Sequence, residues 1–204
     1  MEEDRQTDDP DYLKWLFMLI SPGSSLGGAR PKACVIDHDQ SLWIAKFPSR
    51  YDDHDMGGWE FVVHQLAIAA GIEMAECRIQ RFNSPYHTFL TKRFDRIGIK
   101  RLHFTSAMTQ LGYYDGDYEA SYLELAEFIT FHGSQAQADT ESDNRLDVEL
   151  AMEVIDYFRV KPARAKTIRQ EVSQSVSCWA EKAKTIGLSR SEQEQMAQAF
   201  QSPI

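Results

Sequence analysis

The chain has 204 residues, enough for one large core or two small lobes. Hydrophobic residues make up 43% and charged residues 26%, which excludes a disordered chain, and the net charge of −9 disfavours direct binding of nucleic acid. The acidic start lacks the features of a signal peptide, and the apolar run at residues 15–20 is too short to span a bilayer. We therefore expect a cytoplasmic protein without membrane contact.

The first half of the chain has the pattern of two hairpins separated by a helix. Asp8, Asp9 and Pro10 predict a helix start, and that helix extends to about residue 20. Strand patterns at residues 33–37 and 42–47 predict a hairpin with its turn at residues 38–41. A helix is predicted over residues 59–70, followed by strands at 76–82 and 86–94. This order predicts a small antiparallel sheet that carries one helix.

After Arg96 the patterns are helical. Helices are predicted over residues 103–111, 118–131, 146–158, 162–186 and 189–200. The polar segment 132–145 has no hydrophobic period and predicts a linker. We expect an α+β protein with a β-rich half, residues 1–96, and a helical half, residues 97–204.

The three cysteines and the remaining histidines indicate no metal site. Cys34, Cys77 and Cys178 are far apart, and we expect them to be reduced thiols. No histidine pair has the spacing of metal ligands, so we predict no structural metal.

Residues 21–37, SPGSSLGGARPKACVID, contain a loop rich in glycine and serine that leads into the first predicted strand. It matches neither G-x-x-x-x-G-K-[ST] nor G-x-G-x-x-G, because Ala29 stands where the first motif needs lysine. By itself the loop is either a phosphate-binding loop or a flexible turn.

Lys46 and Glu60 favour the phosphate-binding alternative. Lys46 lies on the second predicted strand, and Glu60 lies near the start of the following helix. In kinase folds a glycine-rich loop covers the phosphates, a strand lysine reaches them, and a helix glutamate holds that lysine. Alone, each residue is as well explained as a surface charge, but the order of loop, lysine and glutamate is specific.

These segments resemble the HipA family of serine/threonine kinase toxins. The resemblance rests on GSSLGGARPKA, LWIAKFPS, the WE of the helix and KRFDR, and it continues more weakly through NRLDVELAMEV and AKTIGL to Phe200. It implies a two-lobed, protein-kinase-like fold with a small antiparallel β lobe and a shortened all-α lobe. It also implies a set of ATP-binding residues: Ser25, Gly27, Gly28, Lys32, Lys46, Glu60, Lys92, Phe94 and Asp95.

Within this set the resemblance assigns individual roles. Lys46 resembles the ATP lysine, Glu60 its helix partner, and residues 92–95 the hinge beside the adenine. Ser25 occupies the place of a serine that is autophosphorylated in the family, although it is also explained as a small residue in a tight turn.

The resemblance fails at the catalytic segment. HipA-like kinases carry a segment resembling N-x-D-D-H-x-x-N, with the base and one magnesium ligand, and later an F-D that binds the second magnesium. Between residues 131 and 146 this chain has only HGSQAQADTESDNR. Asp52-Asp53-His54 lies in the wrong loop, Phe94-Asp95 belongs to the hinge, and Asp139, Asp143 and Asn144 are best explained as linker residues. No catalytic base is predicted, and the expected ligands of magnesium are missing.

Three functions follow from this pattern. The first is a truncated pseudokinase with weak ATP binding and little or no phosphotransfer. The second is an active HipA-type kinase that uses unorthodox metal ligands from residues 132–145. The third is a non-catalytic module that binds a HipB-like helix-turn-helix antitoxin, so that contact with DNA is indirect. Apolar surfaces left by the missing segment also predict a tendency to self-associate.

Overall fold

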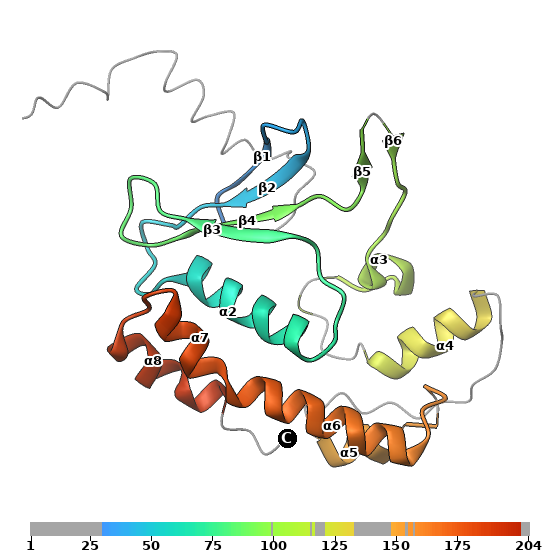
Figure 1. The fold of residues 1–204 in the computed structure, drawn as a ribbon. Coiled ribbons are helices and arrows are strands. Elements are labelled where there is room, and N and C mark those ends of the chain that lie inside the picture. The colour runs from blue at the N-terminus through green and yellow to red at the C-terminus, as the bar shows by residue number, and fades with distance from the viewer. Residues whose placement is uncertain are drawn as a thin grey trace, which may run out of the picture. The chain divides into compact units, whose positions relative to one another are not determined.

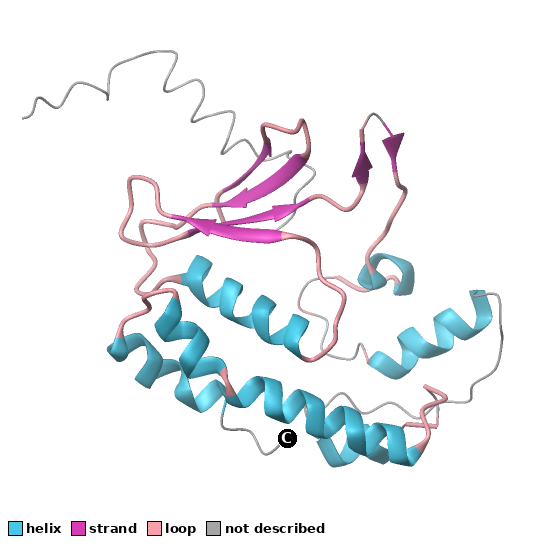
Figure 2. Cartoon of the chain, in the orientation of Figure 1, coloured by secondary structure: helices cyan, strands magenta, loops and turns pink. Residues whose placement is uncertain are grey.

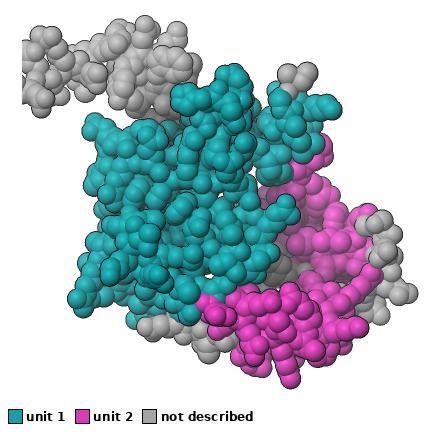
Figure 3. Space-filling view, in the orientation of Figure 1, with its two compact units in different colours: residues 1–102, 175–200 teal, residues 103–174, 201–204 magenta. Residues whose placement is uncertain are grey.

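The structure is a computed structural model that describes residues 30–98, 100–114, 116, 121–132, 148–153, 155, 156 and 158–200. The helix predicted over residues 8–20 lies outside this part. The chain forms two compact units, residues 1–102 with 175–200 and residues 103–174 with 201–204 (Figure 3).

A four-stranded antiparallel sheet forms the centre of the first unit (Figures 1 and 2). Its strands lie in the order β1-β2-β4-β3, where β1 is Lys32–Ile36, β2 is Leu42–Lys46, β3 is Cys77–Gln80 and β4 is Thr88–Lys92. Successive side chains of a strand point to opposite faces. Trp43 and Ala45 of β2 are therefore buried with Leu90 on one face, and Lys46 lies on the other.

Helix α2 (Met56–Ala69) covers part of the face that carries Lys46. The ring of His64 on α2 lies 6.1 Å from the ring of Phe89 on β4, and Phe89 is the cross-strand partner of Lys46. The helix is thus fixed over β4 and β3.

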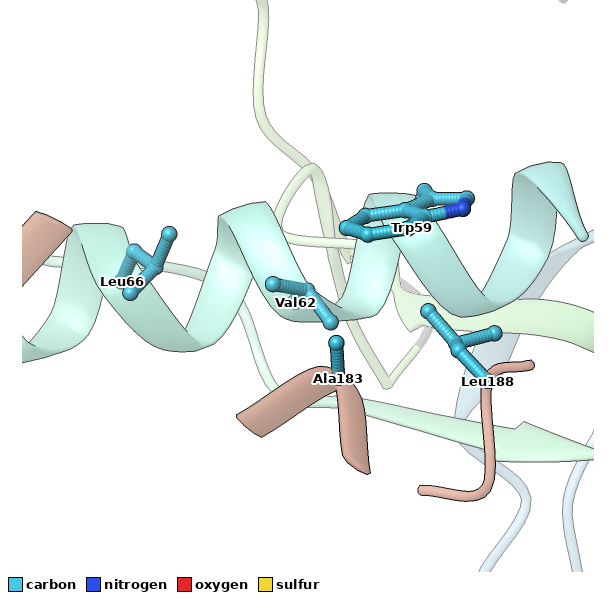
Figure 4. Close-up of a cluster of buried hydrophobic side chains, with 5 residues drawn as sticks. All are labelled: Trp59, Val62, Leu66, Ala183 and Leu188. Atoms are coloured by element: carbon cyan, nitrogen blue, oxygen red, sulfur yellow. The ribbon is translucent and has the colours of Figure 1, made fainter. Parts of the chain in front are cut away.

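The other side of α2 packs on the C-terminal helices of the same unit. These are α7 (Trp179–Thr185), α8 (Arg190–Met196) and the 3₁₀ helix η1 (Ala197–Phe200). The buried cluster at this interface consists of Trp59, Val62, Leu66, Ala183 and Leu188 (Figure 4).

A short hairpin follows the sheet. Strands β5 (Arg96–Ile97) and β6 (Lys100–Arg101) pair in antiparallel fashion, with Arg96 opposite Arg101. Strands of two residues are too short to show an alternating pattern, so the sequence gives no signal for them.

The second unit contains α3 (Ala107–Leu111), α4 (Tyr122–His132), α5 (Val148–Glu153) and most of α6 (Pro162–Ser177). Ser106 caps α3 by accepting a hydrogen bond from Thr109 N. Before α4, Ser121 N donates to Glu124 Oε2 at 2.9 Å, and Glu124 N donates to Ser121 Oγ at 3.2 Å. Such reciprocal caps satisfy donors that a helix start leaves open.

The predicted α+β class and the small antiparallel sheet are confirmed, and every described helix or strand after Arg101 is a helix. Several boundaries differ from the prediction. Helix α2 begins at Met56 and not at residue 59. The helix predicted over residues 162–186 is two helices, because Cys178 N donates to Ser175 O and this tighter turn ends α6.

The compact units also divide the chain differently from the predicted halves 1–96 and 97–204. Residues 175–200 belong to the unit of the sheet, because α7 and Leu188 bury the apolar side of α2. None of the helices in the described part of the chain has the length and hydrophobicity needed to cross a bilayer.

Candidate functional site

Lys46 and Glu60 form the centre of the candidate site. Lys46 ends β2, Glu60 lies in the second turn of α2, and the Lys46 ammonium donates a hydrogen bond to Glu60 Oε1. Lys46 Nζ also lies 5.5 Å from the centre of the Phe89 ring. The two side chains are 37% and 39% exposed, so a ligand could reach the ammonium while the carboxylate holds it.

Lys32 adds a second cation on the same face of the sheet. It is the cross-strand partner of Lys46, and side chains directly opposite each other in a sheet share a face. Two ammonium groups on one face of a sheet can contact the same anion, so the arrangement is suited to phosphate.

The cap of α2 sets the position of Glu60. Asp55 is 2% exposed, and its Oδ1 accepts hydrogen bonds from Gly58 N and from His87 N, both at 2.9 Å. The Oδ2 atom is 2.5 Å from Nδ1 of His87. One carboxylate therefore starts the helix and ties it to the loop between β3 and β4.

Arg30 joins the end of the glycine-rich segment to the loop between β2 and α2. Its guanidinium donates to Asp52 at 2.9 Å and 2.7 Å, and Ser49 N donates to Asp52 Oδ2 at 2.9 Å. Burial opposes ionisation of Asp52, but the hydrogen bonds from Arg30 and Ser49 keep the pKa of its carboxyl below the usual value. This pair was not predicted, since nothing in the sequence relates residues 22 positions apart in two loops.

The loop residues Ser25, Gly27 and Gly28, and with them the predicted autophosphorylation site, lie outside the described residues. Their predicted roles stay predictions.

The structure does not bring Lys92 to Lys46. Lys92 is the cross-strand partner of Trp43, and its Nζ lies 5.8 Å from the centre of that ring. The same ammonium is 3.4 Å from Glu76 and 3.7 Å from Asp39. These contacts place the Lys92 side chain on the opposite face from Lys46, and its predicted role in the hinge stays a prediction.

Asp95 serves as a buried anchor for two arginines. Its side chain is 5% exposed. Arg93 donates to its two oxygens at 2.8 Å and 2.7 Å, and Arg96 also contacts Oδ2. The hydrogen bonds from Arg93 hold the pKa of the Asp95 carboxyl below its ordinary value. These contacts occupy the carboxylate, whereas Phe94 beside it is 62% exposed; the predicted ATP-binding roles of both stay untested.

His64 and Cys77 lie close together under the sheet but lack the properties of a nucleophilic dyad. Cys77 Sγ is 3.1 Å from His64 Nδ1, and His64 Nε2 is 2.7 Å from Ala75 O. Burial raises the pKa of the Cys77 thiol to about 11. A protonated thiol is a poor nucleophile at neutral pH, so we interpret this pair as a hydrogen bond that joins α2 to β3.

No group of three or more His, Cys, Asp or Glu side chains that could hold a metal occurs within the described residues. Asp139, Asp143 and Asn144, the residues considered as unorthodox ligands, lie outside them.

Comparisons with known proteins give one family and one fold. The HipA-like C-terminal domain family matches residues 24–151, more than half of the chain. Among solved structures, the chain is similar to HipA in a toxin–antitoxin complex of HipA, HipB and operator DNA from Shewanella oneidensis. The sequence identity is 14%, the TM-score is 0.50, and the match covers 90% of this chain and 65% of that chain. No curated protein matches the sequence significantly.

Proposed function

We propose that this chain, which belongs to the HipA-like C-terminal domain family, is a toxin-family protein with a two-lobed kinase fold. We expect it to bind ATP weakly and to transfer phosphate poorly or not at all. In this proposal Lys46 and Lys32 bind the phosphates, Glu60 holds Lys46, and the backbone of residues 92–95 adjoins the adenine.

The observation that carries the proposal is the contact between Lys46 and Glu60. A strand lysine held by a glutamate of the next helix is the pair that protein kinases use at the phosphates of ATP. Lys32 opposite Lys46 strengthens the attraction for phosphate. Both lysines and Glu60 lie within the part of the chain that the family matches.

The weak or absent phosphotransfer follows from the sequence after α4. Phosphoryl transfer depends on positioned groups that orient the nucleophile and on magnesium that neutralises the phosphate charge. The polar segment HGSQAQADTESDNR has neither the N-x-D-D-H-x-x-N segment nor a separate F-D. No metal-binding group occurs among the described residues either.

The test is an ATP titration of the purified full chain, with and without magnesium, followed by thermal shift and calorimetry. We expect ATP to stabilise the protein in a manner independent of magnesium, and Lys46→Ala to weaken ATP binding by about tenfold, the loss of one charge-assisted contact. Lys100→Ala, at an exposed lysine of β6, is the matched control and should bind like the wild type. Equal binding by wild type and Lys46→Ala would contradict the proposal.

A phosphotransfer assay with Mg-ATP separates this proposal from an active kinase. Turnover that Lys46→Ala abolishes would show that the enzyme is active. In that case substitution of Asp139 and Asp143 would test whether the segment 132–145 supplies the metal ligands.

A second function, binding of a HipB-like helix-turn-helix antitoxin, is favoured by the solved structure. That HipA is part of a complex with HipB and operator DNA. Coexpression of this chain with a helix-turn-helix protein encoded next to it should give a complex that co-elutes in size exclusion. Separate elution at micromolar concentration would count against this function.

A further inference from the structure

We infer that the C-terminal helices of the first unit, residues 175–200, position Glu60 for Lys46 by holding α2. The inference rests on the proposed function, because it concerns the geometry of Lys32, Lys46 and Glu60, which form the proposed phosphate clamp. It assigns a role in the site to α7 and α8, which contribute no residue to the clamp itself.

The two sides of α2 perform different tasks. Glu60 and His64 contact the sheet through Lys46 and Phe89. Trp59, Val62 and Leu66 follow each other at helical spacing on the other side and are at most 5% exposed. Figure 4 shows Val62 and Ala183 pointing toward each other, with Leu188 close to Trp59. Trp59, which packs on the C-terminal helices, is therefore the direct neighbour in sequence of Glu60, which holds Lys46.

Aromatic rings extend this contact to the end of η1. The ring of Trp59 lies 6.1 Å from the rings of both Trp179 and Phe200. Trp179 and Phe200 stack on each other at 4.8 Å with an interplanar angle of 10°. A shift of the C-terminal helices would thus displace Trp59, and with it the turn of α2 that carries Glu60.

A hydrogen bond joins α8 to the start of α2. Asp55 N donates to Glu192 Oε1 at 2.7 Å, and Asp55 is the residue that caps α2. The other oxygen of Glu192 accepts hydrogen bonds from Ser189 N at 3.0 Å and from Ser189 Oγ at 2.7 Å. Glu192 therefore belongs both to the capping box of α8 and to the contact with α2.

The ion pair between Lys46 and Glu60 needs such support. Both partners are more than a third exposed, and exposed pairs contribute little free energy of their own. The pair is too weak to pull α2 into place, so the packing of α2 must determine whether Glu60 reaches Lys46.

Two pairs of matched variants test the inference. Leu188→Ala and Leu90→Ala remove the same atoms from side chains that are 5% and 4% exposed, but Leu90 packs on the sheet face away from Lys46. Glu192→Ala and Ser189→Ala both break the capping box of α8, but only Glu192→Ala removes the acceptor for Asp55 N. ATP affinity is measured by calorimetry at a temperature at which circular dichroism shows every variant to be folded.

We expect Leu188→Ala and Glu192→Ala to weaken ATP binding by about fivefold, and Leu90→Ala and Ser189→Ala by less than about twofold. In a Glu60→Gln background, Leu188→Ala should have no further effect, because the helices act through Glu60. A merely structural role for Leu188 predicts instead that the two effects add.

The outcomes separate this inference from the proposed function. A wild-type chain that does not bind ATP overturns the proposed function and the inference with it. A wild-type chain that binds ATP, together with unchanged affinity in Leu188→Ala and Glu192→Ala, overturns the inference alone. Glu192 lies on the surface helix α8, so its variant gives an answer even if Leu188→Ala fails to fold.

Discussion

Asp95 is the residue on which the junction between the sheet and the β5–β6 hairpin depends. Its carboxylate is almost fully buried and contacts Arg93 and Arg96, whose side chains are 10% and 20% exposed. Asp95→Asn would leave both guanidinium groups without their anion. We expect the free energy of unfolding to fall by about 3 kcal/mol, the cost of breaking a buried ion pair, as measured by urea denaturation.

The same variant should change how stability depends on acid. The pKa of the Asp95 carboxyl is lower in the folded protein than in the unfolded chain. Its contribution to the free energy of unfolding is therefore complete above the unfolded pKa of about 4 and is lost as pH falls through the folded pKa. On acidification, the free energy of unfolding should therefore fall less steeply in Asp95→Asn than in the wild type. Asp53→Asn, at a side chain that is 89% exposed, is the control; equal acid declines in wild type and Asp95→Asn would refute the role of this carboxylate.

Single residues also mark the limit of what the sequence could predict about the site. The contact between Lys46 and Glu60 was predicted from the order of motifs, and the structure has it. The face that the Lys92 side chain takes could not be read from its predicted place in the hinge; it lies beside Trp43, on the face opposite Lys46. The pairing of Arg30 with Asp52 depends on how two loops fold together, for which a single sequence carries no signal.

Among the elements, those with a regular hydrophobic pattern were predicted well and those fixed by tertiary contacts were not. The strands of both hairpins were found because their side chains alternate. Helix α2 begins earlier than its pattern indicates, since Gly57 and Gly58 disfavour a helix in isolation. Here Asp55 compensates, because its buried carboxylate caps the first turn and binds His87.

Gly57 is a position where only glycine fits the packing of α2. A Cβ atom there would stand 2.2 Å from the carbonyl oxygen of His87, which belongs to the backbone. Gly57→Ala gains helix propensity of about 1 kcal/mol but must shift α2 or the loop before β4. We expect a net loss of stability of about 2 kcal/mol, measured by urea denaturation.

Gly58→Ala is the matched control for this prediction. The nearest atoms to its added Cβ belong to side chains and not to the backbone, Cδ2 of Leu188 at 2.7 Å and Cγ of Asp55 at 3.0 Å. Its loss of stability should be smaller than that of Gly57→Ala. A Gly57→Ala protein as stable as the wild type would show that the His87 backbone is free to move.

For the whole molecule, the division into compact units was the least predictable feature. The sequence order places residues 175–200 with the helical half, whereas their apolar side chains complete the core on α2. Periodicity shows that a helix has an apolar side but not which element covers it. The partner of an amphipathic helix is a property of the whole chain.

The acidic net charge of the whole molecule leads to a prediction about DNA binding. The chain carries a net charge of −9, and DNA binding draws most of its affinity from cations that replace counterions at the phosphates. We expect the protein alone to show no measurable binding to duplex DNA between about 50 and 200 mM salt, as followed by fluorescence anisotropy of a labelled duplex. Addition of a bound helix-turn-helix partner should raise the anisotropy, because the partner then supplies the cations.

The β5–β6 hairpin is a local exception to the acidic net charge. Lys100 and Arg101 are exposed and lie next to Arg96, whose charge Asp95 neutralises in part. A double variant with Lys100→Ala and Arg101→Ala tests whether this hairpin contributes. Direct DNA binding that weakens steeply with salt and is lost in the double variant would mean that a local basic surface outweighs the net charge, and would remove the need for a partner to reach DNA.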